Sequence, residues 1–282
     1  MTATGRATRV TARTTLTIIC AAWLVPVLGL LISSFRTRNA VTSTGWWTVF
    51  APPFRFDQFT LGNYQEVLSG GMGQAFINTV AVAVPAVICP LLAAAFAAYA
   101  FAWMPMPGKN LIFAVIVALL VVPVQSTLIP LLRLFSDLGY SGTFYAVWIA
   151  HSGFAMPLAI YILRNYMGSI PKEIMESARV DGASHFSIFW RFALPLSTPA
   201  VAAFAIFQFL WVWNDFLVAL VFLGGRPDVQ VVTLKLQTMI GSLGESWYLL
   251  TAGAFVTMGV PVIVFLVLQR YFVRGLTAGS AR

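Results

Sequence analysis

One carboxylate lies well inside a long apolar run of this sequence. Asp215 belongs to the stretch Trp211-Val212-Trp213-Asn214-Asp215-Phe216. An ionisable side chain among apolar residues is costly, so Asp215 is a functional candidate. Gln208 and Trp211 precede it by seven and four residues, a spacing that puts all three on one face of a helix. A carboxylate, an amide and an indole on that face could bind hydroxyl groups and cover the apolar face of a sugar.

Two further polar side chains, Gln125 and Asn214, extend this candidate solute pathway. A structural alternative stays open, in which Asp215 and its neighbours form an interhelical hydrogen bond or ion pair that fixes the packing. His151 also lies in an apolar run, where a lone histidine is more often a hydrogen-bonded packing residue than a ligand or proton carrier.

A serine motif invites a catalytic interpretation. Gly139-Tyr140-Ser141-Gly142 matches the G-x-S-G pattern of intramembrane serine proteases, in which the serine pairs with a histidine. His151 lies ten residues further on, about 15 Å away along a helix, whereas proton transfer needs about 3 Å. His185 is expected on the opposite side of the membrane. We therefore predict no catalytic residue.

The composition places these residues in a membrane protein. Of the 282 residues, 59% are hydrophobic and 9% are charged, a balance that no water-soluble domain of this size tolerates on its surface. Cys20 and Cys89 both lie in apolar runs and the two histidines are isolated, so neither a disulfide framework nor a metal site is indicated. The basic residues are scattered at the ends of apolar runs, which argues against nucleic-acid binding despite the net charge of +8.

Six apolar runs are long enough to span a membrane as helices, because about 20 residues cross the hydrocarbon core. We expect an all-α integral membrane protein with spans at residues 16–35, 75–103, 110–134, 142–165, 197–223 and 249–272. Residues 1–15 form an N-terminal tail, 36–74 an extracytoplasmic loop, 75–272 a core of five spans, and 273–282 a C-terminal tail. Arg6, Arg9 and Arg13 precede the first run, but it is long and lacks a convincing cleavage site, so we expect it to be an uncleaved span.

The basic residues predict the orientation. With both termini in the cytoplasm, 11 of the 17 lysines and arginines face inward. The aromatic loop that includes Trp46-Trp47 then lies outside, where its rings suit a membrane interface or a contact with a partner protein. Prolines inside the spans, such as Pro85 and Pro90, remove backbone donors, so neighbouring helices must satisfy the carbonyl groups left free.

A charged, glycine-containing segment interrupts the apolar runs at about residues 166–195. Pro171 suits the first turn of a short helix over about 171–181, and Gly182 can adopt the left-handed conformation that ends it. Asp181 could bond its own backbone in that turn. Ser177 and Ala178 keep one face small enough for close approach to another protein surface.

The spacing across this segment resembles the coupling-loop motif of ABC importer permeases. The family pattern is E-A-A, three residues, Gly, nine residues and I-x-L-P. Ser177 replaces the usual alanine and Phe192 the usual isoleucine, which keeps size class or apolarity. The positions that match this pattern are Glu176, Ser177, Ala178, Gly182, Phe192, Leu194 and Pro195.

Further short motifs are similar to the carbohydrate-importer (maltose-type) branch of these permeases, over roughly residues 60–275. They are Phe76-Ile77-Asn78-Thr79, Pro123-Val124-Gln125 through Ile129-Pro130, Ile170-Pro171, Asp181-Gly182-Ala183-Ser184 and Trp213-Asn214-Asp215-Phe216. In that family the partner permease can supply most of the substrate contacts, which weakens the pathway assignment for Asp215.

The resemblance implies an inner-membrane importer subunit for a sugar. It would work with a second permease as a heterodimer, with an extracytoplasmic solute-binding protein, and with an ATPase dimer that holds ATP and Mg. Glu176, Ser177, Ala178 and Asp181 would dock on the ATPase, and Gly182 would take the motif glycine's role. This chain has no G-x-x-x-x-G-K-[ST], so it would not bind ATP by a P-loop, and the resemblance implies no cofactor on this chain. The alternative is a secondary transporter or channel, which would not need the charged segment.

Overall fold

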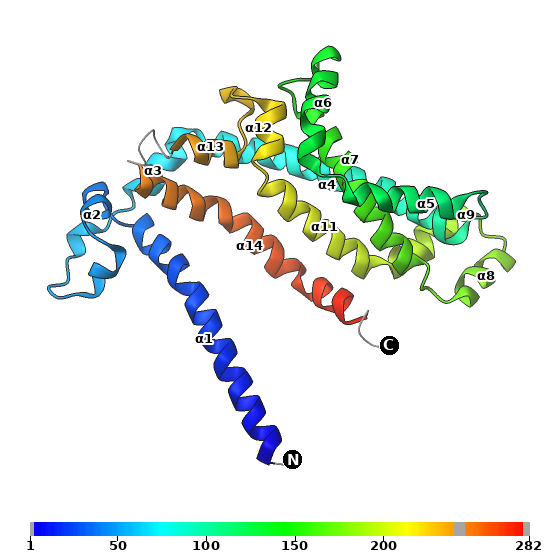
Figure 1. Cartoon of the computed structure of the whole chain (residues 1–282), viewed down its shortest axis with the longest axis horizontal. Helices are drawn as coiled ribbons and strands as arrows, with labels where there is room; N and C mark the ends of the chain where they lie inside the picture. The colour runs from blue at the N-terminus through cyan, green and yellow to red at the C-terminus, as the bar shows by residue number, and fades with distance from the viewer. Residues whose placement is uncertain (1–2, 240–245, 279–282) are drawn as a thin grey trace. The chain divides into compact units, whose positions relative to one another are not determined.

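The computed structural model describes residues 3–239 and 246–278, and this part of the chain is helical without a strand (Figure 1). Within these residues, an isolated antiparallel bridge pairs Arg36 with Phe59. The chain divides into two compact units, Met1–Gly73 with Lys235–Gly259, and Gln74–Leu234 with Val260–Arg282.

The first unit contains the N-terminal helix, the loop after it and the start of the last helix. Its elements are α1 (Ala3–Ser34), α2 (Arg38–Ser43), η1 (Trp46–Phe50), η2 (Phe56–Gln58), α3 (Gly62–Val67), η3 (Leu68–Met72), most of α13 (Val232–Met239) and the beginning of α14 (Trp247–Ala278).

A buried arginine organises the loop of this unit. The Arg36 guanidinium donates to Gln58 Oε1 at 3.1 Å and to the carbonyl and hydroxyl oxygens of Thr44. Asn63 Nδ2 donates to the backbone oxygens of Ser34 and Arg36 at 2.8 Å. Burial lowers the pKa of Arg36 from its ordinary value. These bonds tie the loop to the end of α1, while Trp47 stays exposed. Whether the aromatic rings meet membrane or a partner stays a prediction.

The second unit carries the candidate functional residues. Its elements are α4 (Gly73–Trp103), α5 (Lys109–Ala118), η4 (Leu119–Val121), α6 (Val124–Asp137), α7 (Phe144–Met167), α8 (Lys172–Val180), α9 (His185–Ile188), η5 (Phe189–Ala193), α10 (Leu194–Leu196), α11 (Thr198–Trp213), α12 (Leu217–Leu223), η6 (Pro227–Val229) and the remainder of α14.

Several helices are long and apolar enough to cross a membrane. Four are single helices: Arg9–Ser34, Gly62–Trp103, Phe144–Met167 and Trp247–Val267. Two more stretches are bent pairs, Lys109–Val121 with Val124–Asp137 at 99° and His185–Leu196 with Thr198–Trp213 at 74°. Within the described residues there are thus four spans, or six if each pair is one span. The all-helical membrane fold is confirmed, and the count of six stays a prediction.

The third and fifth predicted spans are not straight helices. The bend in the third falls at Pro123, whose missing amide hydrogen favours a helix start rather than its interior. The uninterrupted helix expected over 197–223 is wrong, because α11 ends at Trp213 and α12 begins at Leu217. The Asp215 carboxylate bonds the first amides of α12 and so competes with a continuous helix.

At the other end of the chain, α14 continues to Ala278, beyond the predicted boundary of the last span at residue 272. Residues 279–282 of the predicted tail lie outside the described residues.

Two apolar clusters hold the second unit together. One packs against the inner face of α8 and contains side chains from the C-terminal half of α4, the C-terminal half of α7 and the start of α11, among them Ala98, Leu163 and Phe204. The other surrounds α12 and includes Phe135 and Trp213. Each cluster therefore positions one candidate site, at α8 and at the 214–216 break.

Neighbouring helices satisfy two carbonyl groups beside prolines in α4. Pro85 and Pro90 cannot donate to the oxygens four residues earlier, on Ala81 and Ala86. Trp148 Nε1 of α7 donates to the Ala81 oxygen at 3.0 Å, and Gln208 Nε2 of α11 donates to the Ala86 oxygen at 3.2 Å. The expectation from the proline positions is confirmed for these two residues.

Candidate functional site: the α8 segment and the 214–216 break

The charged segment forms the short helix expected from its sequence. Pro171 is the N-cap of α8, and Glu173 lies in the first turn, near the positive end of the helix dipole. After the helix, Gly182 has φ +78°, the left-handed conformation that glycine adopts readily. The Ala183 amide donates to the Ala178 oxygen at 3.0 Å and the Gly182 amide to the Arg179 oxygen at 2.9 Å. This pair of bonds is a Schellman motif, so the end of α8 is sharply defined.

One face of α8 is buried against the second unit. Met175 is 1% exposed and Ala178 is 5% exposed, and both belong to the cluster around this helix. They are three residues apart and so lie on the same side. Ala178 is therefore turned inward, contrary to its expected place on a docking face. It positions the helix instead of offering a surface.

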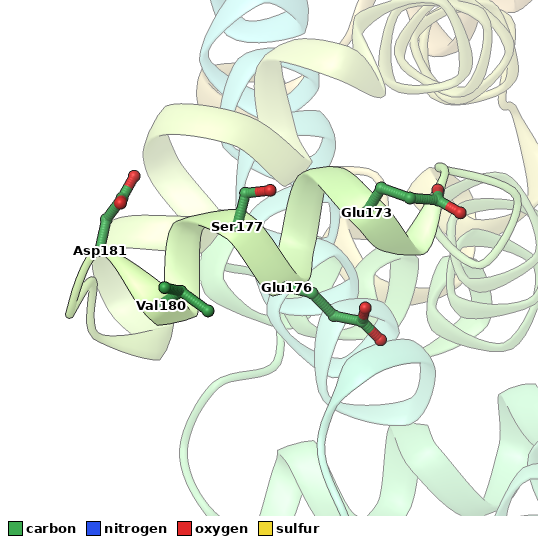
Figure 2. A pocket seen from close by; sticks show the side chains of 5 residues that line it. All are labelled: Glu173, Glu176, Ser177, Val180 and Asp181. Carbon is green, nitrogen blue, oxygen red and sulfur yellow. The ribbon is translucent and has the colours of Figure 1, made fainter.

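The opposite face of α8 is open. Glu173, Glu176, Ser177, Val180 and Asp181 line a shallow pocket on it, and Figure 2 shows their side chains on the outer side of the helix. Val180 is 88% exposed, more than any other large apolar side chain that the structure describes. This face thus combines three carboxylates with an unburied apolar side chain.

The ends of three helices are connected beside α8. The Arg179 guanidinium donates to the backbone oxygen of Trp103, the last residue of α4, at 2.9 Å. Trp103 Nε1 donates in turn to the backbone oxygen of Met167, the last residue of α7, at 3.0 Å. Both oxygens belong to helix ends, where carbonyl groups have no partner within the helix. The position of α8 is therefore fixed relative to α4 and α7.

The chain after Gly182 turns back toward the apolar helices. Ser184 caps α9, its Oγ accepting from the Ser187 amide at 3.2 Å, and His185 Nδ1 lies 3.0 Å from the Tyr99 hydroxyl of α4. Leu194 is half-buried and Pro195 is exposed, and both lie in α10 just before the 74° bend into α11. These two residues shape the exit of the segment instead of extending the face of α8.

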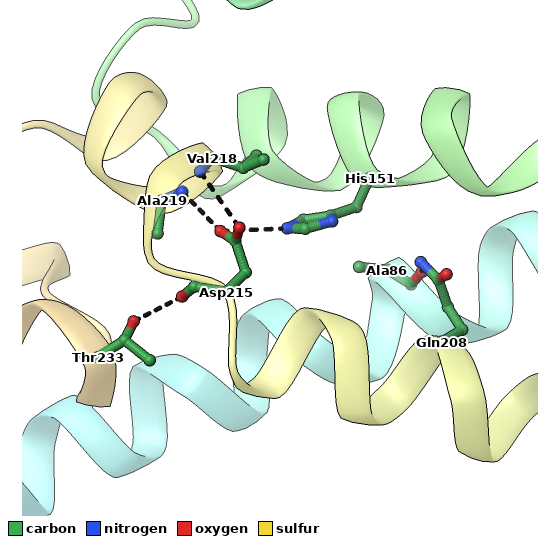
Figure 3. A network of polar contacts seen from close by, with 7 residues as sticks. All are labelled: Ala86, His151, Gln208, Asp215, Val218, Ala219 and Thr233. Atoms are coloured by element: carbon green, nitrogen blue, oxygen red, sulfur yellow. Dashed lines mark hydrogen bonds and ion pairs between the residues drawn. The ribbon is translucent and has the colours of Figure 1, made fainter. Parts of the chain in front are cut away.

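Asp215 lies in the break between α11 and α12 (Figure 3). Its carboxylate accepts hydrogen bonds from the amides of Val218 at 3.3 Å and Ala219 at 2.9 Å, and so caps α12. Its backbone oxygen accepts from Thr233 Oγ1 at 2.6 Å. His151 Nε2 of α7 lies 3.7 Å from Oδ2, and the two form an ion pair when the histidine is protonated. The carboxylate is thus engaged within the chain.

The other predicted pathway residues are not gathered on one helical face with Asp215. Gln208 is fully buried and its amide bonds the Ala86 oxygen. Trp211 is half-buried and its ring meets His151 edge-on, with centroids 5.5 Å apart. Asn214 is exposed and donates to the Leu210 oxygen, and Gln125 is exposed in the first turn of α6. The structure therefore assembles Asp215, His151 and Trp211.

Comparisons with known proteins decide the family. Residues 91–278 match the family described as binding-protein-dependent transport system inner membrane component. This chain belongs to that family. It is 59% identical over 261 residues to the osmoprotective compounds uptake permease protein GgtD of Synechocystis sp., covering 92% of this chain and 88% of GgtD. It is 54% identical to the alpha-glucoside transport system permease protein AglG of Rhizobium meliloti, over 89% of this chain and 67% of AglG.

The fold of the permease matches a solved importer. A chain of a bacterial ABC transporter involved in the import of the acidic polysaccharide alginate aligns with a TM-score of 0.66, over 97% of this chain and 96% of that chain. The sequence identity is 14%, so this likeness shows the fold alone. The permease is a transport subunit and not an enzyme, and it is a multi-pass protein of the inner membrane.

The serine motif of the permease has no catalytic geometry. Ser141 lies in the turn before α7, whereas His151 is 1% exposed and directs its Nε2 toward Asp215. Nδ1, its other ring nitrogen, is buried without a hydrogen-bond partner among the described residues. The structure therefore pairs His151 with a carboxylate and not with the serine.

Two residues of the Phe76-Ile77-Asn78-Thr79 motif bind the loop after α12. Asn78 Nδ2 donates to the backbone oxygens of Asp228 and Gln230 at 3.0 and 2.8 Å, and Thr79 Oγ1 accepts from the Val232 amide at 2.8 Å. These bonds hold the start of α13 against α4. Their role in the permease is therefore positional.

Three residues on α8 were missing from the predicted site. Glu173 and Val180 share the outer face with Glu176 and Ser177, as their spacing in a helix requires. Their spacing in the sequence could therefore have predicted that Glu173 and Val180 belong to the site. Arg179 was counted only for the orientation, because its contact with Trp103, 76 residues away in the sequence, has no signal there.

Proposed function

We propose that this permease is one of two membrane subunits of an ATP-driven sugar importer, and that α8 couples it to a separate ATPase. The observation that carries the proposal is the division of α8 into two faces. Met175 and Ala178 anchor the helix in the second unit, while Glu176 and Val180 stand free on the other side. A helix that is packed against the second unit on one face can transmit to that unit a displacement imposed on its other face.

The chemistry of the free face suits a protein partner. Glu173, Glu176 and Asp181 supply negative charge around Val180. An apolar centre with a charged rim is the usual composition of a protein interface. The complementary surface should therefore hold an apolar socket with basic residues around it. Ser177 leaves room for close approach, as its small side chain predicts.

The orientation proposed for α8 is cytoplasmic, where an ATPase would be. The excess of basic residues on one side of the predicted spans supports it, with Lys172, Arg179 and Arg191 beside the segment and both termini on the same side. ATP and Mg would be held by the ATPase dimer. The cytoplasmic tail proposed from residue 273 would lie on this side as well.

The proposed cargo is a sugar or oligosaccharide delivered by an extracytoplasmic solute-binding protein. AglG is named for α-glucoside transport and GgtD for the uptake of osmoprotective compounds. A glycoside that also protects against osmotic stress would agree with both names. An alginate importer of the same fold has been solved with an alginate pentasaccharide-bound periplasmic protein. A second, different permease would complete the pathway.

Asp215 contributes to the proposed pathway through its position in the break between α11 and α12. Its carboxylate already bonds two amides of α12 and faces His151. Asn214, exposed at the same break, and Gln125, exposed in α6, are freer to meet a solute. We therefore assign Asp215, Gln208 and Trp211 to shaping the pathway, and Asn214 and Gln125 to its surface.

The experiment combines purification with uptake. The tagged permease is extracted gently from its native membrane, and copurifying proteins are identified by mass spectrometry. We expect an ATPase, a second permease and a solute-binding protein. Uptake of a labelled α-glucoside, with and without salt stress, is then measured in cells with and without the gene.

The same experiment distinguishes the proposed importer from a secondary transporter or channel. A secondary transporter or channel would purify without an ATPase from a preparation that preserves other importers. Its uptake would follow the ion gradient or the solute gradient and would survive depletion of ATP. Either result would contradict the proposed importer.

A further inference from the structure

The two prolines of α4 divide this helix into segments that depend on other helices. Pro85 and Pro90 are five residues apart, and each leaves one backbone oxygen without its amide partner. A buried carbonyl group without a partner is costly, and more so where no water can reach it. The stability of α4 therefore depends on the donors from other helices that satisfy these oxygens.

The two donors come from different neighbours. Trp148 of α7 bonds the Ala81 oxygen, and Gln208 of α11 bonds the Ala86 oxygen. They are 67 and 122 residues away in sequence from the oxygens that they serve. Figure 3 shows Gln208 on α11 directed toward Ala86 of α4. Each proline of α4 is thus linked to a separate helix.

These two neighbours flank the segment around α8. α7 ends at Met167, just before α8 begins at Lys172, and α11 begins at Thr198, just after α10. A displacement of α8 would therefore pull on the ends of α7 and α11 first. Through Trp148 and Gln208 the same displacement would reach α4 at its two weakest points, where the intrahelical bonds are missing.

We infer that Trp148 and Gln208 are positioning residues, which fasten the two proline sites of α4 to α7 and α11 and carry the movement of α8 into α4. The inference rests on the proposed function, because it needs α8 to be moved by an ATPase. It assigns a transport role to side chains that belong neither to the face of α8 nor to the break at Asp215.

Gln208 is fully buried, and its Oε1 has no hydrogen-bond partner among the described residues. Its Nε2 bond to the Ala86 oxygen is therefore a buried polar contact between α11 and α4.

The test combines each donor variant with its matching proline variant. Gln208→Met keeps about the same volume but removes the donor, so the melting temperature should fall because a buried carbonyl loses its partner. We expect uptake to fall about tenfold as well, because α11 no longer holds this proline site of α4. The ATPase should still copurify and hydrolyse ATP, so more ATP is consumed per solute. Adding Pro90→Ala returns an amide that can bond the Ala86 oxygen within α4, but it does not restore the link to α11. The melting temperature should then recover, while uptake should stay low.

The second link supplies a matched pair. Trp148→Phe removes the indole donor, and Pro85→Ala should restore the melting temperature of that variant but not its uptake. The crossed combinations, Gln208→Met with Pro85→Ala and Trp148→Phe with Pro90→Ala, should recover neither. Recovery of stability without recovery of uptake does not follow from a purely structural role, in which the two would return together.

Two outcomes overturn the inference, and they are distinguishable from failure of the proposed function. Unchanged uptake by Gln208→Met and Trp148→Phe would contradict it, as would recovery of uptake in the two matching proline double variants, which would show that the donors only satisfy the free carbonyl groups of α4. If the unaltered permease shows no ATP-dependent uptake and no ATPase partner, the proposed function fails as well.

Discussion

The guanidinium of Arg179, in the last turn of α8, donates a hydrogen bond of 2.9 Å to the backbone oxygen of Trp103, where α4 ends. The bond joins α8 to α4, the longest helix of the second unit. It also places a cation against the negative end of a helix dipole. The position of α8 is therefore defined by a polar contact as well as by the burial of Met175 and Ala178.

This contact predicts the effect of Arg179→Leu. The substitution keeps a long apolar stem but removes the donor, so α8 should exchange its amide hydrogens several times faster while α4 and α7 are unchanged. Uptake should fall several-fold, because the donor is exposed and the bond is partly replaced by water. Hydrogen exchange and uptake are measured together, with Arg191→Leu in the same segment as the control. Equal exchange rates in both variants would refute the role of this bond.

A second prediction separates capping from solute binding at Asp215. Asp215→Asn keeps an oxygen that can accept from the α12 amides, so KM for the imported solute should stay within about twofold. Asp215→Ala leaves those amides unpaired and should lower the stability of the protein by about 1 kcal/mol. Melting in detergent and uptake kinetics distinguish the two. A large rise in KM for Asp215→Asn at unchanged melting temperature would restore the solute-binding interpretation.

The loop after α12 gives a prediction about pH. Arg226 donates to both carboxylate oxygens of Asp228, at 3.2 and 2.6 Å, and this bonding lowers the pKa of Asp228. Because the folded-state pKa lies below the unfolded value of about 3.9, the contribution to stability is present above that pH and is lost as the pH falls through the folded pKa. Both groups are exposed, so the effect is small.

Arg226→Gln tests the sign of this pH dependence. The difference in melting temperature between the unaltered permease and the variant should be constant near neutral pH and should shrink in strongly acidic buffer. Asp228→Asn should behave like Arg226→Gln at neutral pH. A difference that grows as the pH falls would show that the assigned sign is wrong.

The free face of α8 predicts a partner-specific defect. Val180→Glu places a charge where we expect the apolar socket of the ATPase, so less ATPase should copurify while membrane insertion stays normal. Phe186→Glu, in the nearby exposed part of α9, serves as the control because Phe186 lies outside the pocket of α8. The ratio of ATPase to permease in the purified material is the measurement. Equal loss in both variants would argue against a contact centred on Val180.

Local signals in the sequence sufficed for the short helix and its end. The spacing from Pro171 to Gly182 predicts α8, and the glycine adopts the left-handed conformation. The small side chain of Ala178 suggests an external docking face, but the structure buries it in the apolar cluster against α8. Its spacing of three residues from Met175 places both residues on the same, inward face.

The donors to α4 and the break at 214–216 could not be predicted, because they depend on contacts between residues that are distant in sequence. The prolines predict that carbonyl groups of α4 need donors, but nothing local names Trp148 or Gln208. The break at 214–216 was hidden because the residues on both sides are apolar and continue a helical pattern. Only the capping of α12 by Asp215, with Thr233 on its backbone oxygen, shows why the helix stops.

The most direct test of the central claim compares two glycines with the same backbone conformation. Gly182 and Gly139 have φ of +78° and +73°, and open space surrounds both. Gly182→Asp and Gly139→Asp therefore impose a similar backbone cost, but only the first changes the end of α8. ATP-dependent uptake is measured at equal amounts of inserted protein. We expect Gly182→Asp to abolish uptake and Gly139→Asp to retain most of it, and normal uptake by Gly182→Asp would contradict coupling through α8.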